Sequence, residues 1–339
     1  MDTRSRYARL AAIAAAFAFL VAVFGAFVRL SNAGLSCPDW PTCYGRITWP
    51  EHADEIAQAN ADFPERAVEV GKAWREQVHR FLAGALILAT FALAAWGWRR
   101  RHEPGQPWKV PLAAAALIVF QALLGMWTVT WKLKPIVVMA HLLGGFATFA
   151  LLVFIALRAS APVARPAMRA VPRAMLVAGI VLLALQVALG GWTSANYAAL
   201  ACGTEYPQCL GSWWPRTDFA EGFVLWRGIG VDYEGGVLDA PARTAIHLAH
   251  RWFALLVAGH LVALGLIAMR RGARALGLAL VAGVVAQVAL GIANVVLGLP
   301  LPVASAHHAV AALLLALMVA LLARDGDAAR GANPGIVPR

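Results

Sequence analysis

The stretch QALLGMWTVTWKLKPIVVMAH, Gln121–His141, recurs later in the chain as QVALGIANVVLGLPLPVASAH, Gln287–His307. Each copy begins with Gln and ends with His twenty positions later, and the copies are 166 residues apart. Each is mostly apolar and is interrupted by a short segment with Pro. This pattern predicts two helices joined by a tight turn, present twice in the chain.

Two cysteine segments follow the same spacing. CPDWPTC, Cys37–Cys43, and CGTEYPQC, Cys202–Cys209, share an acid, an aromatic residue and Pro-x-Cys, and their last cysteines are again 166 residues apart. Two kinds of segment repeated at one offset indicate an internal duplication. We therefore expect two four-helix halves that enter the membrane from the same side, related by an axis along the membrane normal.

The composition indicates the environment of these halves. The chain has 339 residues, of which 60% are hydrophobic and 14% charged, and its mean hydropathy is +0.66. Water-soluble domains are far less apolar. Because a membrane span needs about 20 apolar residues, the sequence predicts an all-α integral membrane protein with eight transmembrane helices arranged as two repeated four-helix bundles. The expected spans are approximately 9–29, 76–98, 110–131, 136–157, 173–194, 244–269, 274–298 and 302–323.

Charge predicts the orientation of the chain. Basic residues gather in the N-terminal segment, in the loop RRRHEPGQPWK (Arg99–Lys109) and after the last span, whereas most acids lie in the opposite loops. Both termini are therefore predicted to be cytoplasmic. The net charge of +11 reflects this topology, and no nucleic-acid partner is expected. The predicted units are an N-terminal half, 1–160, a C-terminal half, 161–325, and a flexible cytoplasmic tail, 326–339.

Four of the nine histidines fall at equivalent places in the two halves. The dipeptides His79-Arg80 and His250-Arg251 are 171 residues apart, an offset that a slightly longer second outer loop explains. The four histidines lie near the outer ends of the second and fourth span of each half, so all four are expected at one depth. Ionisable groups within spans are rare and usually mark a site. Because helix bundles hold haem iron by histidines on facing helices, the predicted ligand pairs are His79 with His141 and His250 with His307.

Other histidines are weaker candidates. A single histidine near a membrane interface is more often a hydrogen-bonded packing residue than a ligand. His308 competes with His307, and only the repeat favours His307. His247 precedes His250 by three residues on the same helix face, where it can line the same pocket. His260 sits deeper and has no counterpart in the first half, and His52 and His102 lie in loops, so these three are expected to be structural or solvated.

All four cysteines fall in predicted outer loops, two in each half. The compartment outside the cytoplasm is oxidising, and Pro, Gly and Asp between the cysteines favour turns. Two local disulfides, Cys37–Cys43 and Cys202–Cys209, are the simplest assignment. A four-cysteine zinc site is the alternative, although exposed thiolates oxidise readily there. A redox role for one disulfide stays open.

Several segments occur together between Arg29 and His307: LSNAGLSCPDWPTCYG, EQVHR, QALLGMWTV with KPIVVMAH, and LGGWTSANYAALACGTEYPQC followed by WWPRTDF. In this combination the chain resembles the haem A synthase family. The resemblance implies an eight-helix enzyme of the bacterial inner membrane. Such an enzyme oxidises a ring methyl of haem O to a formyl group by successive hydroxylation and dehydration, giving haem A for cytochrome oxidase.

The resemblance also implies roles for residues of this chain. The pair His250 and His307 matches the ligands of a permanent haem b, and the pair His79 and His141 matches the ligands of the substrate haem. The acid of the family's E-x-x-H-R motif matches Glu76. The implied haem sites lie toward the periplasmic side, and the implied partners are haem O, haem O synthase and cytochrome oxidase assembly. Nothing in the sequence identifies the electron donor.

The halves differ beside their histidines. Three residues ahead of the first ligand stands Glu76 in one half and His247 in the other. Glu76 is therefore predicted to be catalytic, either stabilising positive charge at the oxidised carbon or accepting a proton. The structural alternative is an acid favoured near a helix N-terminus and paired with Arg80. Arg80 and its equivalent Arg251 occur in both halves, which favours a shared task such as pairing with haem propionates.

Two departures from the family pattern affect these expectations. Only some members have cysteines, so the disulfides are not expected to be required for the chemistry. The first outer loop is long and contains PEHADEIAQANADFPERAVEV (Pro50–Val70), which is polar enough to form an interfacial helix.

A dihaem electron-transfer subunit of the cytochrome b type, or a haem-delivery protein, is the alternative function. It uses the four histidines but gives no reason for an acid in one half only. A transporter explains repeated His and Cys at one face poorly. Small-residue runs such as AAIAAAFAF (Ala11–Phe19) permit close packing of helices, including packing within a homo-oligomer.

Overall fold

The computed structural model describes residues 3–103, 106–160 and 171–331. In this part of the chain it has ten helices and no strand, only two isolated β-bridges. The helices are α1 (Thr3–Leu30), α2 (Ala53–Asp62), α3 (Val70–Arg99), α4 (Lys109–Thr130), α5 (Pro135–Ser160), α6 (Arg173–Ala195), α7 (Phe219–Gly222), α8 (Ala240–Arg270), α9 (Arg274–Val296) and α10 (Leu301–Gly331). All except α2 and α7 are long and apolar enough to cross a membrane. The predicted all-α membrane protein with eight spans is confirmed.

Several helices extend beyond the expected apolar spans. α3 begins at Val70 and α8 at Ala240, each several residues before the expected start. The first turn of α8 is stabilised by Asp239, whose Oδ1 accepts a hydrogen bond from the backbone N–H of Ala242 at 2.9 Å. Hydropathy reports the apolar part of a helix only, so it missed these polar first turns.

The expected unit boundaries stay predictions. Residues 161–170, where the second half was predicted to begin, lie outside the described residues. So do residues 332–339 of the predicted tail. The earlier part of that tail continues α10 as far as Gly331.

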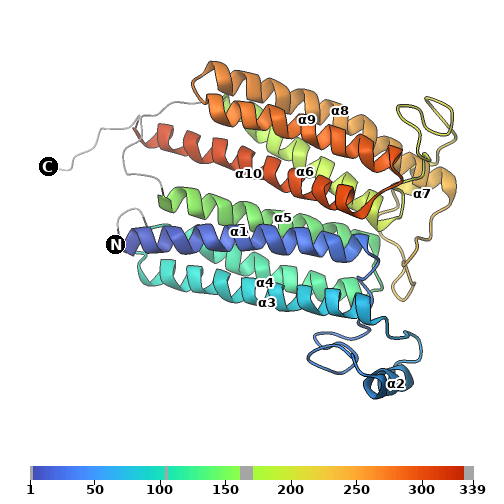
Figure 1. Ribbon diagram of the computed structural model, residues 1–339. Helices are drawn as coiled ribbons and strands as arrows, with labels where there is room; N and C mark the ends of the chain where they lie inside the picture. Colours follow the sequence, from blue (N-terminus) through green and yellow to red (C-terminus); the bar gives the residue numbers. More distant parts are fainter. Residues whose placement is uncertain (1–2, 104–105, 161–170, 332–339) are drawn as a thin grey trace.

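The spanning helices lie side by side and form two groups (Figure 1). In the first group, α1 contacts α3 and α5, and α4 contacts the same two helices. In the second, α6 contacts α8 and α10, and α9 contacts the same two. The groups meet where α5 contacts α6 and α10 and where α1 contacts α10. These are the neighbours that two consecutive four-helix halves require, and the repeat itself stays an inference from the sequence.

Small residues bring the helices close together. One cluster of buried apolar residues runs through both groups, and α1 supplies it mostly with alanines such as Ala11 and Ala14. Alanine lets helix backbones approach closely where no hydrophobic effect between helix and lipid drives association. The Ala-rich run of α1 therefore packs within this chain.

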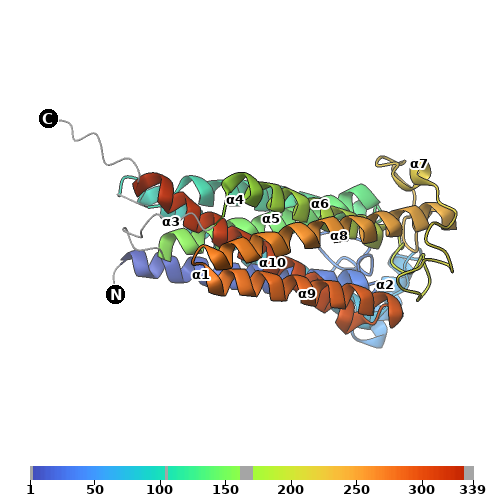
Figure 2. The same ribbon diagram turned by 90° about the horizontal axis from the view of Figure 1, so that it is seen from above.

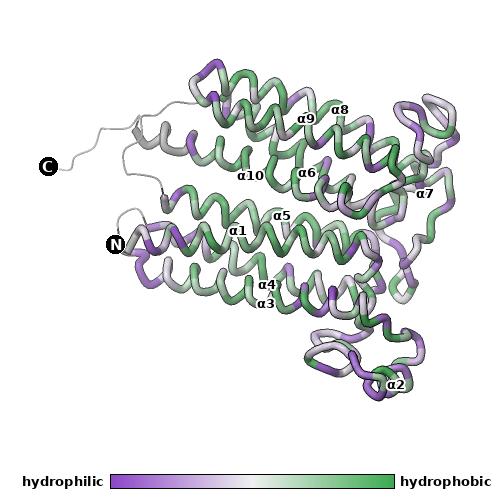
Figure 3. The backbone as a smooth tube through the Cα atoms, in the orientation of Figure 1, coloured by the Kyte–Doolittle hydropathy of each residue, from purple (hydrophilic) through white to green (hydrophobic). Residues whose placement is uncertain are grey.

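The long loops lie at one end of the bundle, together with α2 and α7 (Figures 1 and 2). Hydropathy changes at this end from the apolar spans to polar loops (Figure 3). The start of α1 and the described end of α10 lie at the opposite end (Figure 1). The first long loop, 31–69, contains α2, so the helix predicted in this polar segment is confirmed. The second, 196–239, contains α7.

The two long loops are tied to each other across the halves. Arg66 of the first loop pairs with Glu234 of the second at 2.6 Å and lies 3.8 Å from Asp232. The backbone N–H of Tyr233 donates to the carbonyl of Lys132, in the turn between α4 and α5, at 3.1 Å. The second loop therefore covers part of the first half.

Candidate functional site

The four predicted ligands lie on four different helices, each within about three turns of the end that bears the long loops. These residues are His79 on α3, His141 on α5, His250 on α8 and His307 on α10. Each predicted pair belongs to one helix group: α3 and α5 both contact α1 and α4, and α8 and α10 both contact α6 and α9.

Each of these four imidazoles lies against a glycine of a neighbouring helix. The contacts are His79 on Gly25, His141 on Gly125, His250 on Gly190 and His307 on Gly291. A Cβ added to Gly25 would lie only 2.7 Å from Cε1 of His79, whereas at the other three glycines the distance to the ring would be 3.2 Å. Only glycine leaves room for the rings in their present positions. The helices thus form a cradle on one side of each imidazole.

Several polar atoms beside these rings are buried without a hydrogen-bond partner among the described residues. They include Nδ1 of three ligand candidates and Oε1 of three glutamines: His79, His141, His307, Gln121, Gln186 and Gln287. Two of the amides also reach the imidazoles, with Gln186 Nε2 3.1 Å from His250 Nδ1 and Gln287 Nε2 3.1 Å from His307 Nε2. Orphaned buried polar atoms are rare in folded proteins and indicate a missing partner.

This arrangement fits a porphyrin. No group of three or more His, Cys, Asp or Glu side chains that could hold a metal ion occurs in the described part of the chain. A haem would bring four nitrogens to its own iron, so a pair of neutral imidazoles would be enough to hold it. The cradled, partly unsatisfied imidazole pairs therefore suit one haem in each helix group.

His307 and His308 point in different directions. His307 packs on Gly291 of its own group. His308 instead makes an edge-to-face contact with Phe146 of α5, with ring centroids 5.1 Å apart. His308 thus lies at the contact between the groups, which favours His307 as the ligand.

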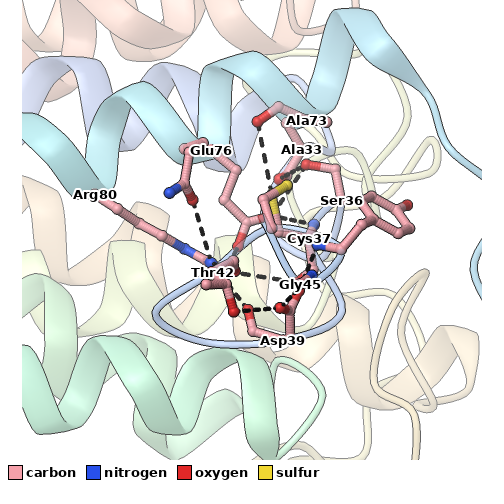
Figure 4. The surroundings of a disulfide bond; sticks show 12 residues. Ala33, Ser36, Cys37, Asp39, Thr42, Gly45, Ala73, Glu76 and Arg80 are labelled. Carbon is pink, nitrogen blue, oxygen red and sulfur yellow. Dashed lines mark hydrogen bonds and ion pairs between the residues drawn. A yellow bond between two sulfur atoms is a disulfide. The ribbon is translucent and has the colours of Figure 1, made fainter. Parts of the chain in front are cut away.

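Glu76 lies one turn before His79 and is almost completely buried. Oε2 accepts hydrogen bonds from the backbone N–H of Cys37 at 2.9 Å and from Ser36 Oγ at 3.0 Å. Oε1 accepts one from Arg80 at 2.7 Å (Figure 4). The carboxylate is thus held by one charged and two neutral donors, and two of the three come from the start of the first outer loop.

Both predicted disulfides are present, Cys37–Cys43 and Cys202–Cys209. No free cysteine remains, so the zinc alternative is wrong. Each disulfide loop is folded around an acid: Asp39 accepts from the N–H of Gly45 at 2.8 Å, and Glu205 accepts from that of Gly211 at 2.7 Å. The acids share the repeat offset, as do the glycines.

Arg80 and Arg251 bind the disulfide loops in the same way. The carbonyls that accept from them are Asp39 (2.9 Å) and Thr42 (2.5 Å) for Arg80, and Glu205 (3.3 Å) and Gln208 (3.2 Å) for Arg251. The two pairs of acceptors are equivalent in the repeat. The shared contact of the two arginines is therefore with the loops, and their predicted pairing with haem propionates stays a prediction.

The other singled-out histidines have structural partners or lie in loops. His247 Nε2 accepts a hydrogen bond from Arg251 Nε at 3.0 Å, so His247 takes the place beside Arg251 that Glu76 takes beside Arg80. His260 hydrogen-bonds the carbonyl of Met175 at 2.9 Å. The N-cap of α2 is His52, and His102 is exposed.

Sequence reasoning missed the glycine cradle and the role of the glutamines. The signal was present, because Gln121 and Gln287 open the two repeated stretches, and Gly125 and Gly291 stand four residues later in each. Gln186 has no such signal, since it stands four residues before Gly190, whereas Val21 stands four residues before Gly25.

Comparison with known proteins gives consistent matches along the chain. The model of the COX15-CtaA family, described as cytochrome oxidase assembly protein, matches residues 8–319. A heme A synthase of Shewanella oneidensis is 45% identical over 314 residues, covering 90% of this chain and 92% of that protein. Heme A synthases of Rhizorhabdus wittichii and Sphingopyxis alaskensis are 30% and 31% identical, and each match covers 91% of this chain and 90% and 88% of the respective relative. The chain therefore belongs to the COX15-CtaA family of cytochrome oxidase assembly proteins.

Proposed function

We propose that this protein is a haem A synthase, which oxidises one ring methyl of haem O to a formyl group and so supplies haem A for cytochrome oxidase. The observation that carries the proposal is the pair of cradled imidazoles in each helix group of a chain whose relatives are named heme A synthase. The multi-pass fold and the bacterial relatives support a location in the inner membrane.

The two imidazole pairs take different tasks. His79 and His141 hold the iron of the substrate haem, because the acid unique to one half lies beside this pair. His250 and His307 hold a haem b, which transfers single electrons when it is bound. Both disulfides lie at the same end of the bundle as the histidines, and disulfides form in oxidising compartments. The haem sites are therefore assigned to the periplasmic side.

The contacts of Glu76 favour one of its two predicted roles. The carboxylate accepts three hydrogen bonds, one of them from a guanidinium, and these contacts fix its orientation. A fixed orientation is what stabilisation of a developing charge requires. Glu76 is therefore assigned to stabilising positive charge that develops at the oxidised ring carbon. Arg80 orients the carboxylate and connects it to the disulfide loop.

Glu76→Gln tests this role, because it removes the charge and keeps the shape. We expect haem A in pigment extracts to fall at least tenfold while the haem b spectrum is retained. Glu69→Gln is the matched control, because Glu69 is exposed and pairs only with Lys72 in the described structure. A normal haem A yield from Glu76→Gln would exclude the role.

The haem b assignment has its own test. His307→Ala is expected to abolish the haem b spectrum, and His308→Ala to retain it, because the two rings face different groups. Pigments extracted from the purified protein also distinguish the enzyme from the main alternative. Haem O or haem A beside haem b supports the enzyme, whereas two equivalents of haem b indicate an electron-transfer protein.

A further inference from the structure

A lysine is buried at the outer end of the first half. Lys134 ends the turn between α4 and α5 and precedes the first residue of α5, Pro135. Its side chain is completely inaccessible to solvent, and Nζ has no hydrogen-bond acceptor among the described residues. Burial lowers the pKa of this ammonium group. A buried cation without an anion is costly, so the site lacks a partner.

Two tryptophans enclose this ammonium group. Nζ lies 3.3 Å from the ring centroid of Trp226 and 5.4 Å from that of Trp131. Trp226 belongs to the second outer loop, so the cover over Lys134 comes from the other half of the chain. The aromatic faces stabilise the cation, but they leave the three N–H donors of Nζ without an acceptor.

Two features indicate that Lys134 binds an anion, and that this anion is a haem propionate. The 26-residue helix α5 begins next to Lys134, and its N-terminus carries partial positive charge. Seven residues further along the chain lies His141, which places Lys134 about 10 Å outward along the helix at 1.5 Å per residue. This spacing is comparable with the reach from a haem iron to its propionate carboxylates.

Arg80, the cation first expected to pair with propionates of the first site, is already occupied. Arg80 donates to two carbonyls of the disulfide loop and to Glu76, as described above. Lys134 has no such partner. We infer that Lys134 is the anchor for a propionate carboxylate of the porphyrin bound between His79 and His141. This inference rests on the proposed function and assigns to Lys134 the contact first expected of Arg80.

The anchor distinguishes the two haem sites. The residue equivalent to Lys134 in the second half is Pro300, which has no charge. A haem held permanently between His250 and His307 therefore has no corresponding buried cation. A propionate anchor in the first half alone suits a site that must take up and orient a substrate.

Titration with two porphyrins tests the inference. Protein purified from cells unable to make haem O is titrated with haem O and with its dimethyl ester, in which both propionates are neutral. The readout is the absorbance change on binding. For Lys134→Met we expect affinity for haem O to fall about tenfold, as for loss of one charge-assisted hydrogen bond, with affinity for the ester unchanged. Lys134→Arg should restore most of the affinity for haem O.

Lys132→Met is the matched control, because Lys132 is exposed two residues earlier in the same turn. It should bind both porphyrins as the wild type does, and haem b content should be normal in every variant. Equal affinities of Lys134→Met and wild type for haem O would overturn the inference. If Lys134→Met lost affinity equally for haem O and for its dimethyl ester, the inference would also be overturned. Lys134 would then have a packing role or bind a lipid phosphate. If the wild type bound no haem O at all, the proposed function would fall with it.

Discussion

Replacing Gly25 by alanine should displace His79 without unfolding the protein. The new Cβ would lie 2.7 Å from Cε1 of His79 and 3.0 Å from Nε2. Carbon atoms in contact settle about 3.5 Å apart or more, so the ring or the helix must move by roughly 0.8 Å. Overpacking of this kind costs roughly 1–3 kcal/mol, whereas replacing glycine within a helix stabilises it by about 1 kcal/mol. The net loss in stability is therefore about 2 kcal/mol at most.

The displaced ring should affect haem far more than folding. Loss of the groups that orient a metal ligand lowers metal affinity about 10–100-fold, and we expect a loss of this size in haem O affinity for Gly25→Ala. Porphyrin titration measures the affinity, and thermal unfolding measures the stability. Haem b absorbance should be unchanged, because the second pair lies in the other helix group.

Two matched variants make this result specific. Gly84→Ala changes a glycine of α3 whose added Cβ meets nothing within 4 Å, so haem O binding should be normal. At Gly291 the added Cβ would lie 3.2 Å from His307, and a shift of roughly 0.3 Å relieves the contact. Gly291→Ala should therefore weaken haem b binding only slightly. Wild-type haem O affinity in Gly25→Ala, or an equal loss in Gly84→Ala, would refute the reasoning.

Three further predictions concern the outer loops. Arg80→Met should lower the thermal unfolding temperature more than Arg251→Met, because it leaves a buried carboxylate unpaired, at a cost of roughly 3–5 kcal/mol; equal shifts would contradict this. Burial raises the pKa of Tyr44 to about 12, so the unfolded chain, whose tyrosines ionise near pH 10, releases this proton first. Wild-type stability should therefore fall relative to Tyr44→Phe as the pH rises from 9 to 11, and parallel curves would argue against it. Arg66→Ala breaks a half-exposed ion pair with Glu234 and should cost less than about 1 kcal/mol, with the difference shrinking in 1 M salt; a salt-independent loss would indicate a packing role.

Much of the fold could be predicted because membrane spans depend on length and apolar composition, and both are visible in the sequence. The ends of the helices could not, since the first turns of α3 and α8 are polar and extend beyond the apolar stretch. α2 was predictable from the polar segment in which it lies. Hydrogen bonds from the N–H groups of Glu51 and His52 to Glu55 stabilise its start.

The candidate site could be predicted where the halves could be compared. The repeat selected four histidines, placed two cysteines in each half, and marked Glu76 as different. It could not reveal what Arg80 binds, because backbone carbonyls are acceptors that any sequence provides. Nor could it reveal the surroundings of Lys134, because the ring against its ammonium group comes from a loop of the other half.

The position of Trp226 has a consequence for biosynthesis. Membrane proteins are made from the N-terminus, and earlier parts fold first. The helices that bear His79 and His141 are complete before the second loop is synthesised, so at that stage the ammonium group of Lys134 lacks its contact with Trp226. Its cover, and the ion pair that holds the cover to Arg66, arrive only with the later half. A chain cut between the halves would therefore yield an N-terminal fragment that has both predicted ligands of the first site but lacks Trp226 and the second loop.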